Sequence, residues 1–533
     1  MLKNNSAGES EGSAGQQCAP STQVDVAAAN TNAFVGDDNR RGASWDLVQG
    51  PRNYVSLVGA QVAGASLSFG SVWLATRFLG ADGYGGVVAL IAASQLVLLL
   101  GVNWTSLTVA RFGCEEFVET GRIATTFWTR LAIFVPNVIL VLALSPLWRP
   151  LLSKVLHLPP NSVWLVLSLF LINAWWLHVQ QALQGVKLLR LQGWLLTVER
   201  VVIFSAICFL SFTGRVSVWT VGWVYFIGPL AASLVGLFRL RTLIWPVSQI
   251  DFPLLKRMLR FSLPIIPTAF VGFLSTNYLD ALFILHFLSQ VKLGIYAVTY
   301  QLVGLAQQLP LLAGYLLMPL FVTLQSGKQE NRTLRFMKEV LPLLTLLWTL
   351  GCVLMAAAGW YLLPLVFGAK FSESGPLMWP LMAATTLAGP ILMGYSPVAT
   401  STSNTYITMI GVTLGSSANL ILNFLLVPRF GLLGCAWATT ASYGINAIVV
   451  FLLVHWRILP GYTWTLQAML PIVLGALCAS ITGNNLTALG LSLIVGIIVA
   501  LAHRKSIAIG LKTLKDYRRF TFNPNLTPAT GPT

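Results

Sequence analysis

The sequence predicts an all-α polytopic membrane protein with about fourteen transmembrane helices. Of its 533 residues, 56% are hydrophobic and only 9% are charged, whereas soluble globular proteins carry about 25% charged residues. The mean hydropathy is +0.73. Fourteen membrane crossings of about 20 residues need about 280 residues, which is close to the whole apolar content of the chain. A soluble multidomain enzyme, the class that length alone would suggest, is excluded.

The first 52 residues differ in composition from the rest of the chain. They are rich in Ser, Gly, Ala, Asn and Asp, and their only aromatic residues are Phe34 and Trp45. Such a segment cannot bury enough apolar surface to offset its conformational entropy, so residues 1–52 are predicted to form a disordered cytoplasmic tail. The segment lacks the basic and apolar regions of a signal peptide, so cleavage is not expected.

Apolar stretches separated by short polar breaks follow from Tyr54 onward, each about as long as a membrane crossing requires. The predicted spans are 54–77, 84–108, 124–148, 162–185, 194–213, 217–238, 262–287, 294–321, 340–365, 376–400, 405–427, 431–455, 466–483 and 486–503. Gly483-Asn484-Asn485 predicts a tight turn between the last two spans. Residues 504–533 are predicted to form a basic cytoplasmic tail, and Ile250–Arg260 an amphipathic helix at the cytoplasmic interface.

The basic residues set the expected orientation. If the N-terminus is cytoplasmic, 23 of the 33 Lys and Arg lie on the inner side and 7 on the outer side, with Arg130 and Arg200 inside spans and Lys3 far from any. This asymmetry follows the positive-inside rule and predicts an even number of spans with both termini cytoplasmic. It also accounts for the net charge of +16 without nucleic acid as a partner.

The two halves of the sequence are weakly similar to each other. Phe78, Leu79, Gly85 and Phe112 recur 209 positions later as Phe287, Leu288, Gly294 and Phe321. A parallel repeat of two six-helix bundles is a common transporter arrangement, with the substrate site at the interface between the repeats.

Motifs of enzymes and metal sites are absent from the sequence. It has no phosphate-binding G-x-x-x-x-G-K-[ST] loop, no H-E-x-x-H and no nucleophile elbow. The six cysteines are scattered, so they are interpreted as packing residues and not as disulfides or metal ligands. We therefore expect no enzyme activity, no metal and no cofactor. Transport by such a chain must draw on an ion gradient or on the gradient of the substrate.

Ionisable residues inside predicted spans are the main functional candidates, because charge is costly in the membrane. Asp280 lies near the middle of the seventh span, and Asn277 precedes it by one helical turn on the same face. They are candidates for contact with substrate or a coupling ion, and the alternative is a hydrogen bond that packs helices. Arg130 either faces a cavity and binds an anion or snorkels to the cytoplasmic surface. Glu199 and Arg200 point to different sides of the fifth span, with Arg200 as the candidate for the lumen.

Uncharged polar residues inside the spans form a second set. Gln301 belongs to this set and is a candidate substrate ligand, because amide groups both donate to and accept from sugars. Gly411, Gly415, Asn419 and Asn423 are four residues apart and form one helical stripe, which favours close helix packing.

Three segments of the chain carry a recognisable pattern: Arg77-Phe78-Leu79-Gly80-Ala81-Asp82-Gly83-Tyr84-Gly85, then Phe261-Ser262-Leu263-Pro264 with Asp280 and Gly294-Ile295-Tyr296, then Asn419-Leu-Ile-Leu-Asn423 with Pro428-Arg429-Phe430-Gly431-Leu432-Leu433-Gly434-Cys435-Ala436. Together they resemble the polysaccharide and O-antigen flippases of the multidrug/oligosaccharidyl-lipid/polysaccharide exporter superfamily. The third segment is the most specific, and in it Cys435 replaces an alanine of the family pattern.

The resemblance implies a fold and a substrate. The fold would have two six-helix lobes around a central cavity, at 53–240 and 241–455, plus two extra transmembrane helices within 456–503. The substrate would be an undecaprenyl-diphosphate-linked oligosaccharide, flipped by alternating access across the bacterial plasma (inner) membrane for O-antigen, exopolysaccharide or capsule synthesis. Arg130 and Arg200 would pair with the diphosphate, with Arg77 at the outer rim. H+ or Na+ is the candidate coupling ion, and membrane lipids, a polysaccharide polymerase and glycosyltransferases are the candidate partners.

Three alternatives stay open at this point. A cation-coupled drug or metabolite antiporter of the same superfamily is disfavoured because the first span has only Gln61 and small polar residues where such antiporters often carry an acid. A lipid II flippase would share the fold. A polysaccharide polymerase or ligase is an enzyme of the same pathway, but it would need a large outer loop, and the longest outer break here runs only from Arg149 to Asn161.

Overall fold

The computed structural model of the protein describes residues 49–155, 158–159, 161–186, 188–263, 277–326, 330–459, 461 and 463–522. Within these ranges every regular element is helical, which confirms the predicted all-α class. Nine of the described helices are long and apolar enough to cross a membrane, and two shorter apolar helices cover Tyr278–Phe287 and Leu470–Thr482. Each of the fourteen predicted spans overlaps a helix.

The first half of the chain runs from the start of α2 to the end of α9. Its elements are α2 (Gln49–Gly101), η1 (Asn103–Thr105), α3 (Leu107–Thr120), α4 (Ala124–Ala143), α5 (Ser145–Val155), α6 (Ser162–Gly185), α7 (Leu189–Phe212), α8 (Val218–Ile244) and α9 (Phe252–Ser262).

The second half begins at α11. Its elements are α11 (Asn277–Phe287), α12 (Gln290–Ser326), α13 (Glu330–Arg335), η3 (Phe336–Val340), α14 (Leu341–Phe367), η4 (Ala369–Phe371), α15 (Ser374–Pro390), η5 (Ile391–Tyr395), α16 (Ser396–Ser401), α17 (Tyr406–Arg457), α18 (Thr465–Ala468), α19 (Leu470–Thr482), α20 (Asn485–Ala502) and α21 (Arg504–Phe522).

Two long helices each contain two predicted spans joined at a glycine. A helix of 53 residues would be about 80 Å long if straight, far more than a bilayer of about 30 Å. The backbone of α2 leaves the helical conformation at Gly80 (φ 68°), and that of α17 leaves it at Gly431 (φ 61°). Residues with a β-carbon rarely adopt such angles, so glycine is the residue that allows the chain to turn at these two positions.

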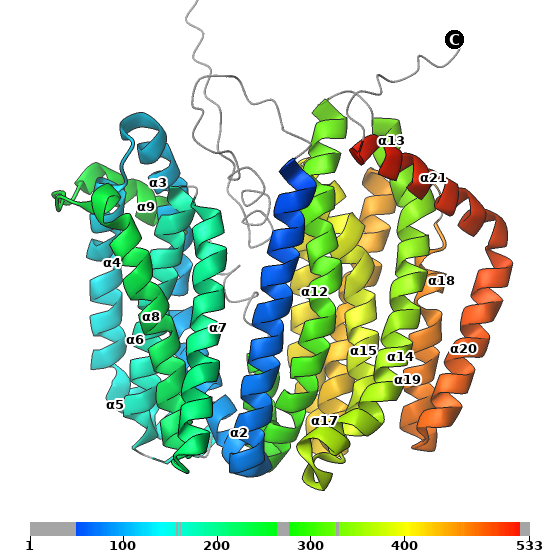
Figure 1. The fold of residues 1–533 in the computed structure, drawn as a ribbon, viewed down its shortest axis with the longest axis horizontal. Coiled ribbons are helices and arrows are strands. Elements are labelled where there is room, and N and C mark those ends of the chain that lie inside the picture. Colours follow the sequence, from blue (N-terminus) through cyan, green and yellow to red (C-terminus); the bar gives the residue numbers. More distant parts are fainter. Residues whose placement is uncertain are drawn as a thin grey trace, which may run out of the picture.

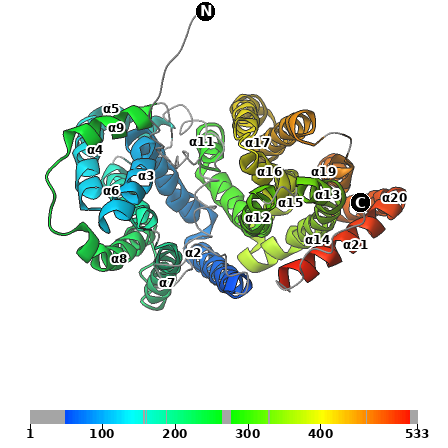
Figure 2. The same ribbon diagram turned by 90° about the horizontal axis from the view of Figure 1, so that it is seen from above.

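The helices form two groups that face each other (Figures 1 and 2). In Figure 1, α3–α9 lie on the left and α12–α21 on the right, with α2 between them. Large apolar side chains are exposed on the outside of both groups, among them Phe209 (66%), Leu365 (79%) and Ile494 (58%). An outward apolar surface is what a lipid-embedded protein requires, because the surrounding hydrocarbon replaces water.

The predicted amphipathic helix near residue 250 is confirmed as α9. Asp251 caps it by accepting a hydrogen bond of 3.0 Å from the backbone N–H of Leu254, and Pro253 occupies the first turn. It lies across the ends of α3 and α4 (Figure 1). There Arg257 forms an ion pair with Glu115 at 3.1 Å.

The chain ends differ from the sequence prediction. Residues 1–48, most of the predicted N-terminal tail, lie outside the described residues, and Gln49 to Arg52 already belong to α2. The predicted basic tail begins with a helix, α21, which docks on η3 through Gly510 and Thr513. The start of α2 and the whole of α21 lie at the same end of the molecule, the top of Figure 1. The predicted lobe boundary at residue 240 falls inside the last turn of α8.

Asn485, the first residue of α20, is expected to be needed for docking that helix onto α14 and α15. Its side chain is buried, accepts a hydrogen bond of 2.8 Å from the indole of Trp379 and donates one of 2.9 Å to the carbonyl of Ala357. Asn485→Leu leaves the indole N–H of Trp379 and the carbonyl of Ala357 buried without these hydrogen bonds. The substitution is expected to destabilise the protein by about 1–3 kcal/mol. A lower melting temperature of the detergent-solubilised protein would show this. Asn484→Ser is the control, because serine keeps the helix cap, and equal melting of both variants would contradict the prediction.

Candidate functional site

Asp280 is the centre of a buried polar cluster in the second half of the chain. The side chain lies on α11, is 1% exposed and receives four hydrogen bonds. Tyr296 Oη donates to Oδ2 at 2.7 Å and Thr439 Oγ1 donates to it at 2.9 Å. Asn423 Nδ2 and Asn419 Nδ2 donate to Oδ1 at 3.0 and 3.4 Å. The cluster therefore joins α11, α12 and both arms of α17.

In all four hydrogen bonds around Asp280 the carboxylate is the acceptor. An ionised carboxylate accepts only, so this shell suits the charged form. No ion pair among the described residues includes Asp280. The amide oxygen of Asn423 is buried beside it and has no hydrogen-bond partner. A carboxylate together with an unpartnered amide oxygen and two hydroxyls is an oxygen-rich site of the type that hard cations prefer.

Of the two other candidates for this region, Asn277 and Gln301, only Gln301 has a described side chain. Asn277 is the first residue of α11, and its side chain lies outside the part of the structure that is described. Gln301 is half-buried on α12, five residues after Tyr296, so the helical period turns it to a different side of that helix.

Arg130 is fully buried in the first half of the chain. It lies on α4 and is 0% exposed, so the snorkelling alternative is wrong for this structure. Its Nη1 is 2.5 Å from His178 Nδ1 on α6, and Nη2 donates to Thr105 Oγ1 at 3.4 Å. The guanidinium also lies 5.4 Å from the ring centroid of Phe134. Arg130 Nε and His178 Nε2 have no hydrogen-bond partner, so this part of the molecule holds a positive charge without an acid among its described contacts.

Glu199 and Arg200 are separated as their adjacency on α7 predicts. Glu199 is buried and accepts a hydrogen bond of 2.9 Å from the indole of Trp176. Arg200 is half-buried and lies close enough to Tyr225 of α8 and Tyr278 of α11 to interact electrostatically with both. Arg200 therefore lies near Tyr278 of the helix that carries Asp280, whereas Arg130 contacts His178, Thr105 and Phe134 in the first half.

Helix α11 connects the two charged regions. It lies between the two groups of helices (Figure 2). Residues two apart on a helix are separated by about 200°, so Tyr278 and Asp280 point in opposite directions. Tyr278 on one face of α11 is near enough to Arg200 of the first half to interact with it electrostatically, and the other face carries Asp280 and its shell. A rotation or bend of α11 would therefore change the surroundings of Tyr278 and of Asp280 together.

The two halves are packed together very closely at one end. A β-carbon on Gly85 would lie 1.9 Å from the carbonyl oxygen of Gln290, and one on Gly294 would lie 2.0 Å from that of Ala81. Gln290 Nε2 also donates a hydrogen bond of 3.0 Å to the carbonyl of Asp82. Gly85 and Gly294 are equivalent positions of the 209-residue repeat, so the contact joins matching parts of the two halves. It lies at the end opposite α9 and α21 (Figure 1).

Asp280 and the two asparagines of its shell stand out in the sequence, whereas the other two members of the shell do not. Tyr296 and Thr439 were not candidates, although Tyr296 belongs to the Gly294-Ile295-Tyr296 segment. The packing interpretation of the stripe on α17 applies to Gly411 and Gly415, whose faces meet Asn446 and Ser442. The remaining two members of the stripe, the asparagines, form hydrogen bonds across to Asp280 of α11, which agrees with interhelical packing. His178, the partner of Arg130, lies 48 positions away in the chain, and no pattern in the sequence links the two residues.

Comparisons with known proteins agree with this architecture. Residues 51–325, just over half of the chain, match the family described as "Polysaccharide biosynthesis protein". No curated protein matches the sequence. Among solved structures, the fold is similar to "Lipid II flippase MurJ, inward closed conformation", with a TM-score of 0.62, 15% identity and coverage of 85% of this chain and 100% of that one. It is also similar to the inward-facing conformation of "a multidrug resistance MATE family transporter of the MOP superfamily", with a TM-score of 0.55, 16% identity and coverage of 75% and 94%.

At these identities the solved structures share the fold with this protein, and the family follows from the sequence match. The chain is a polytopic membrane protein that belongs to the polysaccharide biosynthesis protein family.

Proposed function

We propose that the protein flips an undecaprenyl-diphosphate-linked oligosaccharide from the cytoplasmic to the outer leaflet of a bacterial plasma membrane by alternating access. The product would feed O-antigen, exopolysaccharide or capsule assembly, with glycosyltransferases supplying the substrate and a polymerase consuming it. Both termini and α21 would lie on the cytoplasmic side, where most of the basic residues are placed. Family membership supports the lipid-linked sugar as the substrate class.

The observation that carries the proposal is the placement of α11 between Arg200 and the Asp280 shell. A diphosphate is a strong partner for a guanidinium in a site shielded from water. We assign direct contact with the diphosphate to Arg200, which is half-buried and faces the other half of the molecule. Arg130 is enclosed in this conformation and adds positive potential from behind His178.

Asp280 is proposed to bind the coupling cation, H+ or Na+. Its shell supplies the carboxylate, the unpartnered amide oxygen of Asn423 and the hydroxyl of Thr439. Because α11 carries both Tyr278 and Asp280, cation binding on one face is linked to the substrate region on the other. Asn277 on α11 and Gln301 on α12 are proposed as further residues along the substrate path.

Arg200→Gln is expected to slow flipping at least tenfold, because glutamine is polar and can still form hydrogen bonds but lacks the charge and the forked N–H donors that pair with the diphosphate. The assay uses proteoliposomes that contain a fluorescent undecaprenyl-diphosphate-linked sugar, with flipping followed by protection from a membrane-impermeant quencher. Arg215→Gln is the matched control, since Arg215 is exposed at the end of α7. Unchanged flipping by Arg200→Gln, and by its combination with Arg130→Gln, would rule out this residue assignment.

The same vesicles separate the proposal from its rivals. Protein-dependent flipping of lipid II but not of the undecaprenyl-diphosphate-linked oligosaccharide would favour a lipid II flippase, a name that one structural relative bears. Uptake of a cationic dye against a Na+ or H+ gradient, without flipping of either lipid, would favour an antiporter.

A further inference from the structure

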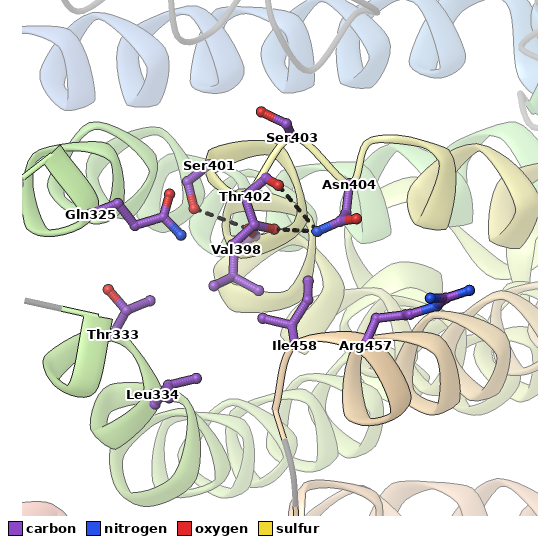
Figure 3. Close-up of a pocket in the computed structure, with 10 residues that line it drawn as sticks. All are labelled: Gln325, Thr333, Leu334, Val398, Ser401, Thr402, Ser403, Asn404, Arg457 and Ile458. Atoms are coloured by element: carbon purple, nitrogen blue, oxygen red, sulfur yellow. Dashed lines mark hydrogen bonds between the residues drawn. The ribbon is translucent and has the colours of Figure 1, made fainter. Parts of the chain in front are cut away.

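A second polar site lies at the end of the second half where α12, α13, α16 and α17 meet. It is a pocket of about 430 Å³, within the range of ligand pockets in proteins. Figure 3 shows Gln325 and Thr333 on one side of it, the loop from Ser401 to Asn404 above and Arg457 on the other side. None of the described residues that line the pocket carries a carboxylate. It is separate from the Asp280 shell and shares no residue with it.

The loop between α16 and α17 presents oxygen atoms to this pocket. The Ser401 hydroxyl donates to the carbonyl of Val398 at 3.0 Å, and the Thr402 hydroxyl donates to the same carbonyl at 2.9 Å. Asn404 Nδ2 donates to Thr402 Oγ1 at 3.1 Å, which leaves the Asn404 amide oxygen to accept. Because the hydroxyl hydrogens are used internally, the loop offers acceptors, and its complement is a ligand with several O–H donors.

The loop is also held in a fixed shape. Ser403 has a positive φ of 59°, which is uncommon for a residue with a β-carbon. The backbone N–H of Asn404 binds the carbonyl of Ala399 at 2.7 Å and keeps the loop in place.

Thr333 supplies an unused polar group on the opposite wall. Its side chain is 3% exposed, and its hydroxyl has no hydrogen-bond partner. A buried hydroxyl without a hydrogen-bond partner destabilises the empty protein. A ligand that fills the pocket and bonds to this hydroxyl removes that cost. Arg457 stands at the rim as the cation, with its guanidinium 4.2 Å from the ring centroid of Trp456. Its side chain is exposed, so rotation about its own bonds can bring the guanidinium to a bound anion.

We propose that this pocket binds a phosphorylated polyol, that is, a ligand with a phosphate group next to several hydroxyls. The hydroxyls would donate to Ser401 Oγ, Asn404 Oδ1 and Thr333 Oγ1, and the phosphate would pair with Arg457. Such a ligand can be a water-soluble sugar phosphate or the headgroup of phosphatidylglycerol. The site does not depend on the flipping function proposed above, and its test needs no flipping.

The test measures binding to the purified full-length protein in detergent. Glucose 1-phosphate is titrated and followed by melting temperature and by quenching of tryptophan fluorescence, with inorganic phosphate and glucose as separate half-ligands. Phosphatidylglycerol and phosphatidylcholine binding are compared by native mass spectrometry. We expect saturable binding of glucose 1-phosphate or of phosphatidylglycerol, with each half-ligand at least about tenfold weaker than glucose 1-phosphate, because both groups contribute.

Two variants and one control assign the binding to this pocket. Thr333→Val is expected to weaken binding about fivefold without lowering the melting temperature of the empty protein, since the lost hydroxyl had no partner. Arg457→Gln is expected to weaken it about tenfold. Arg429→Gln, at an exposed arginine beside the Gly431 kink in the middle of α17, should bind as the wild type does.

Each outcome decides the question. Binding of glucose 1-phosphate that responds to both variants supports the site with a soluble ligand. Binding of phosphatidylglycerol alone, with the same response, supports the site with a lipid ligand. Absence of saturable binding of either probe, or equal binding by wild type, Thr333→Val and Arg457→Gln, overturns the proposal. Inorganic phosphate binding as tightly as glucose 1-phosphate overturns the role of the hydroxyls.

Discussion

Gly294→Ala is expected to reduce flipping by about 5- to 150-fold. The added methyl group would lie 2.0 Å from the carbonyl oxygen of Ala81, so the two halves cannot pack as they do here. Forcing a methyl group into a packed contact costs about 1–3 kcal/mol, which corresponds to that range of population change. Because the contact is between the halves and not within one of them, the cost falls on this conformation of the transporter more than on folding.

Gly304→Ala is the matched control for this prediction. Gly304 lies on the same helix, and a β-carbon there would have no heavy atom within 4 Å. Alanine stabilises a helix relative to glycine by about 1 kcal/mol, so this variant should flip lipid normally and melt at the same or a higher temperature. Flipping at the wild-type rate by Gly294→Ala would show that the Gly85–Gly294 contact does not take part in the transport cycle.

A distance measurement tests the same contact directly. Spin labels are placed on the exposed positions Phe78 and Lys370, on a background in which the six native cysteines are replaced. In Gly294→Ala the distribution should shift toward longer distances than in the otherwise identical protein with Gly294, because the halves separate at this end.

The arrangement of the spans could be predicted from the sequence because it depends on local composition. Apolar stretches of about 20 residues have only one stable solution in lipid, the helix, so every predicted span overlaps one. The turn at Gly80 falls in the break between the predicted spans 54–77 and 84–108, and the turn at Gly431 falls at the first residue of the predicted span 431–455, although the described helices continue through both with a kink. The basic composition of the C-terminal segment predicts a tail. The close contact of Gly510 with the backbone of Glu339, which docks α21, cannot be predicted from composition.

The candidate site could be predicted only in part, because its members are far apart in the chain. Asp280 stood out as a charge in an apolar segment. The groups that bind it are 16 to 159 positions away, and a single sequence does not reveal such pairings. The asparagine stripe on α17 was recognised, but periodicity cannot tell whether an amide faces a helix backbone or a carboxylate. The same applies to Arg130, whose depth in the span was clear and whose partner, His178, was not.

Asp280→Asn is expected to remove the dependence of flipping on a cation gradient and to lower the rate at least about tenfold. The variant should still fold, because the shell can adapt to a neutral amide. Oδ1 would keep accepting from Asn419 and Asn423, and the hydroxyls of Tyr296 and Thr439 can rotate to accept from Nδ2. Asp82→Asn is the control, since Asp82 is exposed and its contact with Gln290 uses the backbone carbonyl.

Melting temperature separates cation binding from transport. A cation that binds only the folded protein stabilises it by about 2.7 kcal/mol at 100 times its Kd, so Na+, compared with K+ at equal ionic strength, should raise the melting temperature of the wild type and not of Asp280→Asn. If H+ is the ion, the same difference between the two proteins should appear as pH falls. A wild type that responds to neither ion, and whose flipping ignores both gradients, would leave Asp280 as a structural group.

The position of Asp280 explains why a bound cation would matter to the substrate. A carboxylate in the membrane interior is costly even when hydrogen bonds surround it, because those bonds spread its charge without cancelling it. A monovalent cation in the shell neutralises Asp280 on one face of α11, while a diphosphate at Arg200 neutralises the opposite charge on the other face. When both ligands are bound, the charges on the two faces of α11 are neutralised. Separating the two halves of the molecule then costs less electrostatic free energy. Asp280→Asn imitates only the first of these two neutralisations, so it should uncouple the ion from the lipid and leave the binding of the lipid-linked sugar intact.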